Sequence, residues 1–368
     1  MKDQSKNNTP TPVGKSEKRS SLGFLLPVIS LAAFLWMSKT GLIPAKAHQS
    51  DHPVWPAMQE SPPFKVLYPA ADTVLLDTAL YNRMILHLVH DRPSGGWPVE
   101  TPFPLPDAVL PFKRIVAYYG NLYSPGMGIL GALSPDEMLA KLQEEVKSWE
   151  DADPFTPVQP ALHYVAVTAQ PAPGAGGRYR LRMPSSQIDR VLEIAKEIEA
   201  LVFLDIQVGH STLQEEIPLL ENYLLLPHVH IGIDPEYSMK RGQVPGSAIG
   251  TFDAADINYV SGYLAGLVRE YGLPPKILIV HRFTKAMVTD YKKIETLPEV
   301  QIVMNMDGFG FPAKKINTYQ RFIAGEPVQF TGFKLFYRQD TRDSRWPELM
   351  QPGEILKLYP KPIYIQYQ

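Results

Sequence analysis

The sequence contains no cysteine among its 368 residues. Disulfide bonds, thiolate metal sites and cysteine nucleophiles are therefore excluded. A lipid-anchored lipoprotein is excluded as well, because its lipid is attached to a cysteine at the cleavage site. Without cross-links the protein must draw its stability from a hydrophobic core, and 45% hydrophobic residues are enough for a large one.

Several familiar functional patterns are also missing. The formal net charge is only -2 and there is no long basic stripe, so nucleic acid is not an expected partner. No Gly-x-Ser-x-Gly elbow is present, which argues against a serine hydrolase of that type. Gly126 and Gly128 form a Gly-x-Gly, but the third glycine of the dinucleotide fingerprint is absent. No nucleotide or other cofactor is therefore expected.

What the chain does contain is a repeated alternation of short apolar runs with helix-like stretches. Eight such runs, each ending in polar residues, predict strands at 114–119, 163–168, 202–207, 229–234, 276–281, 301–307, 331–337 and 362–367. Strand and helix in alternation favour a parallel sheet, and eight repeats favour an α/β fold of the (β/α)8 TIM-barrel type. The segment 107–368 is close to the roughly 250 residues of a typical barrel. An open doubly wound sheet and a partial barrel are the alternatives.

The N-terminal segment 1–47 has the features of an export signal. Basic residues precede an apolar stretch at 22–37, and Ala45-Lys46-Ala47 forms an Ala-x-Ala cleavage site. The sequence therefore predicts a secreted or extracytoplasmic protein. The alternative is an uncleaved membrane anchor formed by 22–37, which would be the chain's only contact with a membrane.

The segment 48–106 is rich in proline, which favours an extended linker with one helix at 73–90 that could close the bottom of the barrel. Within the barrel, Ser134 and Glu137 form a capping box that predicts the start of a helix. Helices are expected at 135–149, 185–200, 212–225, 253–271, 285–294, 313–323 and 352–358.

Polar residues gather where the predicted strands end. Side chains alternate across a strand, so one parity faces the interior of a barrel and the other packs on the helices. Placing the aliphatic residues against the helices turns one set of polar residues toward the C-terminal rim: Asp205, Asp234, Glu236, His281 and Asp307. Barrel enzymes hold their chemistry at this rim, so these five are the candidate site.

Asp234-Pro235-Glu236 is the sharpest local pattern. Residues i and i+2 of a strand share one face, so the two acids are expected about 6.5 Å apart, and the pKa of one should rise. A raised acid beside an ionised carboxylate is the arrangement that glycoside cleavage needs. We assign the proton donor to Glu236, an orienting role to Asp234, and the base or nucleophile to Asp205 or Asp307. The plainer interpretation is that acids beside a proline cap a turn.

Other polar and aromatic residues near the strand exits are candidates for binding substrate. The first strand offers Tyr118 or Tyr119, and parity does not decide between them. The expected binding set is Gln207, His281, Arg282, Tyr118, Lys334, Tyr337 and Gln366. The rim acids and His281 are competent metal ligands, but no His-Glu-x-x-His motif is present, so no metal is assigned. His228 and His230 lie at the N-terminal end of their strand and are expected to be structural.

Several stretches resemble a family of exported bacterial proteins of unknown function with a glycoside-hydrolase-like TIM barrel. The resemblance covers 112–368 and is carried by the strings 203–209, 232–236, 249–258, 332–337 and 364–368. It implies a defined domain but no established activity. The acid pair of the fourth strand also resembles the Asp-x-Glu of chitinase-type barrels, although the longer Asp-rich run of that motif is missing.

These patterns predict a glycosidase-like hydrolase that acts on carbohydrate or a cell-wall polymer by a carboxylate acid–base mechanism. One alternative is a barrel without catalysis that binds carbohydrate or a partner in the cell envelope. The other is a metal-dependent hydrolase. Acids in an open groove would favour the first, acids neutralised by Arg or Lys the second, and tight convergence on one point the third.

Overall fold

The computed structural model describes residues 75–368. The predicted signal or anchor at 1–47, and the linker up to residue 74, lie outside the described residues. Within 75–368, no helix combines the length and apolar character needed to cross a membrane.

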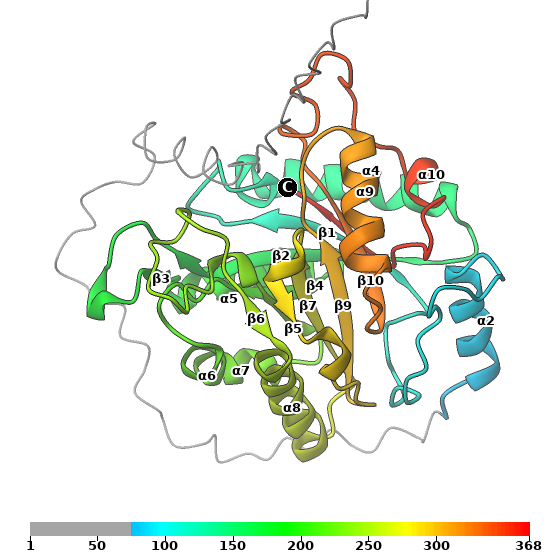
Figure 1. Ribbon diagram of the computed structural model, residues 1–368, viewed down its shortest axis with the longest axis horizontal. Coiled ribbons are helices and arrows are strands. Elements are labelled where there is room, and N and C mark those ends of the chain that lie inside the picture. Colours follow the sequence, from blue (N-terminus) through cyan, green and yellow to red (C-terminus); the bar gives the residue numbers. More distant parts are fainter. Residues whose placement is uncertain (1–74) are drawn as a thin grey trace, which may run out of the picture.

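Eight parallel strands close into a barrel at the centre of the molecule (Figure 1). Their order around the ring is β1-β11-β10-β9-β7-β5-β4-β2, and β2 pairs again with β1. The predicted TIM-type barrel is therefore confirmed. Its strands are β1 (Arg114–Gly120), β2 (Val158–Ala169), β4 (Leu201–Ile206), β5 (Val229–Ile233), β7 (Lys276–Arg282), β9 (Val300–Met306), β10 (Phe330–Leu335) and β11 (Tyr364–Tyr367).

The inner face of the barrel changes character along the strands. The lower interior is apolar and includes Phe203, Ile279 and Val303. Two residues later on the same inner face, the strands present polar side chains. These are Asp205 on β4, His281 on β7, Asn305 on β9, Lys334 on β10 and Gln366 on β11, all buried. Along the strands, the inner face thus changes from an apolar core to a layer of polar side chains at the C-terminal end of the barrel. This end is called the mouth.

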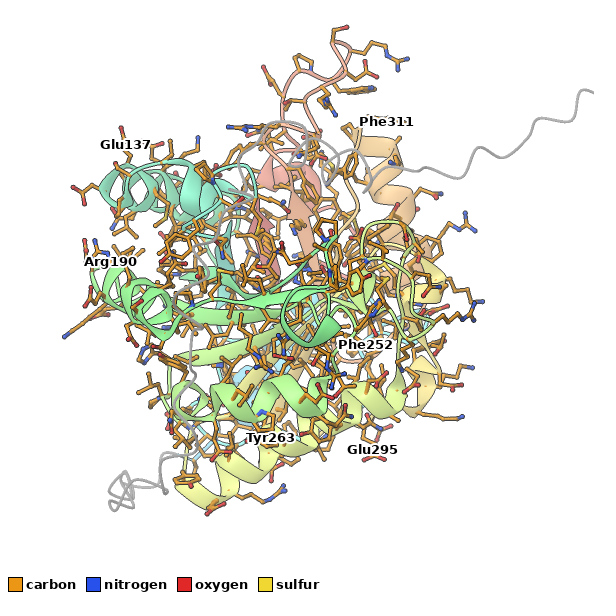
Figure 2. All side chains as sticks on the ribbon, turned by 90° about the vertical axis from the view of Figure 1, so that its left-hand side faces the viewer. Glu137, Arg190, Phe252, Tyr263, Glu295 and Phe311 are labelled. Carbon is orange, nitrogen blue, oxygen red and sulfur yellow. The ribbon has the colours of Figure 1, made fainter. Side chains whose placement is uncertain are left out.

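Helices surround the barrel and bury its outward-facing aliphatic side chains. Glu137, Arg190 and Tyr263 mark three of them at the periphery (Figure 2). The helices are α2 (Thr78–Leu88), α3 (Ile129–Ala132), α4 (Pro135–Ala152), α5 (Ser185–Lys196), α6 (Leu213–Glu216), α7 (Glu221–Leu224), α8 (Ala254–Tyr271), α9 (Pro312–Tyr319) and α10 (Pro352–Ile355). Three short strands lie outside the barrel: β3 (Arg180–Arg182), β6 (Phe252–Asp253) and β8 (Val288–Thr289).

Helix boundaries follow their capping residues. The predicted capping box is present, since the Ser134 side chain accepts from the Glu137 N–H and the Glu137 side chain accepts from the Ser134 N–H. Asp253 and Asp256 form a second box at the start of α8, which ends at Gly272 with φ 64°. A left-handed φ suits glycine, so the sequence determines both ends of this long helix.

Two of the helix predictions are wrong in part. The segment 285–294 is not one continuous helix. Two 3₁₀ turns, Lys285–Met287 and Tyr291–Lys293, lie on either side of Val288 and Thr289, which pair with β6, and Asp290 has a left-handed φ of 56°. The stretch 212–225 is interrupted at Pro218, where a 3₁₀ turn, Ile217–Leu220, separates α6 from α7. The alternation of strand and helix therefore lacks a full helix after β7.

The polypeptide preceding β1 closes the bottom of the barrel. Leu88 at the end of α2 belongs to the inner apolar cluster, together with Leu110. The side chain of Gln301 on β9 accepts from the Leu110 N–H at 3.0 Å and donates to the Leu110 carbonyl at 2.5 Å. Both contacts are buried, so one amide side chain satisfies the backbone of the residue that plugs the barrel.

We expect Gln301→Leu to lower the free energy of unfolding by about 1–3 kcal/mol. The substitution leaves the Leu110 N–H and carbonyl without partners in an apolar setting. Urea denaturation measures the loss, with exposed Gln214→Leu on α6 as the matched control. Equal stability of the two variants would contradict a structural role for Gln301.

Candidate functional site

The centre of the polar mouth is Asp205 at the end of β4, whose side chain is fully buried. The Tyr119 hydroxyl donates to Asp205 Oδ2 at 3.1 Å. On the other oxygen, His163 Nε2 and His281 Nε2 lie 3.3 and 3.4 Å from Oδ1. These three neighbours come from β1, β2 and β7, so the carboxylate joins four strands of the barrel.

A second carboxylate extends this network. His281 Nδ1 lies 3.0 Å from Asp307 Oδ2, and Lys334 Nζ forms an ion pair with Asp307 Oδ1 at 3.0 Å. Lys334 also lies over the Tyr119 ring, 3.8 Å from its centroid, which is a cation–π contact. Asp205, His281, Asp307, Lys334 and Tyr119 therefore form one closed circuit of charged and polar contacts.

Asp234, the first residue after β5, joins the same network. Gln207 Nε2 lies 3.4 Å from Asp234 Oδ2 and 3.5 Å from the Tyr119 hydroxyl oxygen, at the outer limit of hydrogen bonding. Asp234 Oδ1 accepts from the Glu236 N–H at 3.0 Å. The structure thus brings Asp205, Asp234 and Asp307 to one end of the barrel, as strand parity predicts.

The prediction that Asp234 and Glu236 share one face of a strand is wrong. The strand β5 ends at Ile233, and Pro235–Tyr237 is a 3₁₀ turn capped by the Asp234 side chain. Proline fixes φ near the helical value, which ends the strand and starts the turn. The two acids are consequently turn neighbours and do not share a strand face. Glu236 remains buried beside the site, at 8% exposure.

Charge within the cluster separates its acids into two groups. Burial raises the pKa of a carboxyl, but His281 and His163 outweigh burial at Asp205 and lower its pKa. Lys334 and His281 likewise lower the pKa of Asp307 against the effect of burial. Burial by itself would lower the pKa of His281, but the charges of Asp205 and Asp307 outweigh it and raise the pKa. These three groups are therefore charged at neutral pH.

Asp234 and His163 behave in the opposite way. Burial raises the pKa of Asp234 to about 7, and the neighbouring charges of Asp205 and Asp307 add to this despite the opposing effect of His281. Burial also lowers the pKa of His163 to about 4, so this ring is neutral at neutral pH. The mouth thus holds a carboxyl that keeps its proton up to about pH 7, beside carboxylates that are already ionised there.

Three residues of the expected binding set do not join the cluster. The Tyr118 hydroxyl contacts the Tyr337 hydroxyl at 3.0 Å, and Tyr337 donates to Glu145 of α4, on the outer side of the barrel. The Arg282 guanidinium donates to Glu326 and to several loop carbonyls. By contrast, Gln366 lies inside, where it accepts from Asn305 at 3.4 Å.

Sequence reasoning missed His163 as a member of the site and left Tyr119 undecided. The strand β2 begins at Val158, five residues before the predicted start, so His163 lies mid-strand and opposite Tyr119. Strand parity places Gly232 on the inner face as well, but sequence reasoning assigned this glycine no role. A Cβ at this glycine would lie 2.5 Å from both Asp205 Oδ1 and His163 Nε2, so only glycine lets β5 pass these atoms.

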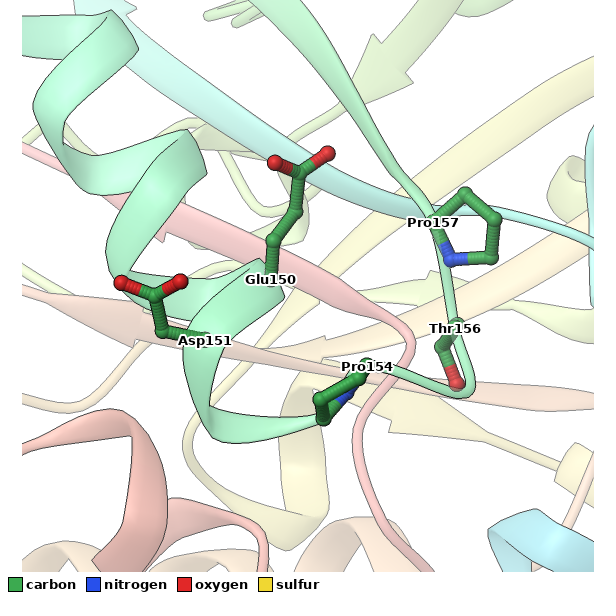
Figure 3. A pocket seen from close by; sticks show the side chains of 5 residues that line it. All are labelled: Glu150, Asp151, Pro154, Thr156 and Pro157. Atoms are coloured by element: carbon green, nitrogen blue, oxygen red, sulfur yellow. The ribbon is translucent and has the colours of Figure 1, made fainter.

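A hollow of about 440 Å³ lies elsewhere, at the opposite end of the strands. It is lined by Glu150 and Asp151 at the end of α4 and by Pro154, Thr156 and Pro157 of the loop that enters β2 (Figure 3). Asp151 is already paired with Lys147 at the surface. The hollow contains none of the titratable groups of the mouth, so we place the candidate site at the mouth.

Lys334→Met should lower the free energy of unfolding by about 3–5 kcal/mol, because it leaves the Asp307 carboxylate in a buried position without its ammonium partner. The matched control is Lys147→Met, which removes an exposed ion pair with Asp151 and should change stability very little. Chemical denaturation of both variants tests this. A Lys334→Met protein as stable as the control would mean that the ion pair does not support the mouth.

The sequence was compared with protein-family models and with curated proteins. No family model matches the sequence, and no curated protein is significantly similar to it. The resemblance to exported bacterial proteins therefore gains no support from these comparisons. What the chain shows is a TIM-type barrel, compatible with a hydrolase, that holds a buried cluster of acids and histidines at its mouth.

Proposed function

We propose that the protein is a glycosidase-like hydrolase that cleaves carbohydrate or a cell-wall polymer with carboxylate groups at the mouth of its barrel. The observation that carries the proposal is the convergence of Asp205, Asp234 and Asp307, from three strands, into one network with His281 and Lys334. Barrel enzymes place their reacting groups at this end of the strands.

The roles follow from exposure. Asp205 is fully buried, whereas Asp234 is 3% exposed and the Asp307 side chain 9% exposed. Asp205 therefore acts from beneath, where it holds Tyr119 and His281 in position. Asp234, Glu236 and Asp307 are slightly more exposed than Asp205, and in this proposal they are the acids that meet the substrate.

Asp234 is the proton donor in this proposal, and Asp307 is the ionised partner. A carboxyl that keeps its proton near neutral pH can protonate a leaving oxygen, while an ionised carboxylate serves as base or nucleophile. Glycoside cleavage needs this division. The sequence-based assignment of the donor to Glu236 moves to Asp234, because Asp234 is the acid directly linked to the Gln207–Tyr119–Asp205 network. Glu236 remains the neighbouring carboxylate. An exported enzyme would meet such polymers outside the cytoplasm.

One observation favours a carbohydrate-binding barrel without catalysis as the second candidate. Lys334 neutralises Asp307, and the acids are enclosed at the end of the barrel. A binder needs no free base, so an ion-paired carboxylate suits it well. Turnover decides between the two, because a binder retains glycan without cleaving it.

Asp234→Asn should reduce kcat on a cleaved glycan by about 10²–10⁴-fold, since an amide cannot donate the proton. With the wild type, activity should fall as pH rises through about 7, because Asp234 then loses the proton it must donate. The measurement is a pH–rate profile on a panel of soluble glycans and cell-wall fragments.

Two controls accompany this experiment. Asp151→Asn removes an exposed carboxylate of α4 and should leave both rate and profile unchanged. Glu236→Gln tests the sequence-based donor in parallel. Full activity of Asp234→Asn would discard the assigned acid, and binding without turnover across the panel would replace the hydrolase by a carbohydrate-binding barrel.

A further inference from the structure

Three buried atoms in the mouth face one another without hydrogen-bond partners. They are His163 Nε2, Asp205 Oδ1 and His281 Nε2, and none of them makes a hydrogen bond within residues 75–368. The two histidine nitrogens lie 3.3 and 3.4 Å from the carboxylate oxygen, but neither contact has hydrogen-bond geometry. Leaving three polar atoms unsatisfied in a protein interior is costly, so their convergence calls for an explanation.

From this geometry we propose that His163, Asp205 and His281 bind a divalent transition-metal ion, with zinc as the natural probe. All three atoms lie within 4.8 Å of one another. Zinc–nitrogen and zinc–oxygen bonds of about 2.0–2.2 Å place neighbouring ligand atoms roughly 3.0–3.5 Å apart. The two contacts with Asp205 Oδ1 already have this spacing.

The second polar atom of each ligand side chain contacts another residue. These contacts orient the remaining atom of each side chain toward the proposed position of the ion. His163 Nδ1 contacts the Tyr364 hydroxyl at 2.7 Å, and Tyr119 donates to the second oxygen of Asp205. His281 Nδ1 lies 3.0 Å from Asp307. A histidine that donates its distal N–H to a carboxylate and offers the other nitrogen to an ion is a recurrent feature of metal sites. At His281 the ion would displace the proton that the charged ring carries on Nε2 in the ion-free protein, and that proton would be released on binding.

Because Gly232 has no side chain, one side of the proposed ion position stays open. A Cβ there would lie 2.5 Å from two of the three ligand atoms, Asp205 Oδ1 and His163 Nε2. A Cβ at this position would therefore occupy the space between these ligand atoms or displace them, while the identity of every ligand residue stays the same. Two imidazoles and one carboxylate form a donor set that suits zinc or iron(II) better than calcium or magnesium, which prefer oxygen ligands.

The proposed ion goes beyond the proposed function and does not depend on glycan cleavage. An ion at this depth would supply Lewis-acid chemistry directly beneath the outer carboxylates Asp234 and Asp307. Failure of the glycan assay would leave metal binding unaffected. Failure of metal binding would leave the carboxylate mechanism as stated.

The test is zinc binding by the full chain after it has been stripped with a chelator. We expect one zinc ion per chain after equilibration and gel filtration, and an increase in Tm when zinc is added. His163→Gln and Asp205→Asn should each lose the bound ion. His230→Gln is the matched control, because His230 is also fully buried in the barrel but lies outside the three-atom cluster. It should retain one ion per chain.

Two further variants test the space for the ion and the support of one of its ligands. Gly232→Ala should abolish zinc binding, whereas Gly262→Ala on α8, where a Cβ meets no atom within 4 Å, should not. Asp307→Asn should weaken zinc binding roughly 10- to 100-fold through loss of the histidine's carboxylate partner.

If the ligand variants do not fold, the visible spectrum of the cobalt(II)-loaded wild type decides. A spectrum altered from that of aqueous cobalt supports nitrogen and carboxylate ligation in the protein. An unaltered cobalt spectrum, or the absence of stoichiometric zinc in the wild type, would overturn the proposal. So would zinc binding that is equal in folded His163→Gln, Asp205→Asn and His230→Gln.

Discussion

The structure of the mouth depends on the burial of one carboxylate, that of Asp205. A buried charge must be compensated by neighbouring groups, and here Tyr119, His163 and His281 arrive from three other strands to do so. Two of the neighbouring groups are charged and are compensated in turn. His281 contacts the Asp307 carboxylate, and Asp307 forms an ion pair with Lys334. The barrel therefore gathers polar groups at its C-terminal end, although an apolar interior would be easier to stabilise.

Strand alternation explains why much of this could be predicted. Once the aliphatic residues of a run are placed against the helices, the parity of a strand decides that Asp205, His281, Gln366 and Asp307 turn toward the mouth. The apolar runs themselves are long enough to identify all eight strands of the barrel. Parity depends only on the sequence of one strand, so it can be applied without knowing the partner strands.

The rest could not be obtained from the alternation of apolar residues alone. His163 was missed because β2 starts before its apolar run, at Val158. Asp234 and Glu236 were placed on a strand face, although Pro235 turns the chain there. The non-helical segment 285–294 depends on pairing between β8 and β6, which local propensity does not reveal. Only the last of these depends on a tertiary partner, whereas the turn at Pro235 is set by the local sequence.

Closure of the barrel has a consequence for how the chain folds. The first strand, β1, completes its pairing only when β11 arrives, as in the pair of Ile115 with Tyr364. During synthesis, one edge of β1 therefore stays open while almost all of the barrel emerges, and an open edge is a template for aggregation. Contacts so distant in sequence also slow folding. A chaperone that shields β1 until the last strand is made would serve this topology well.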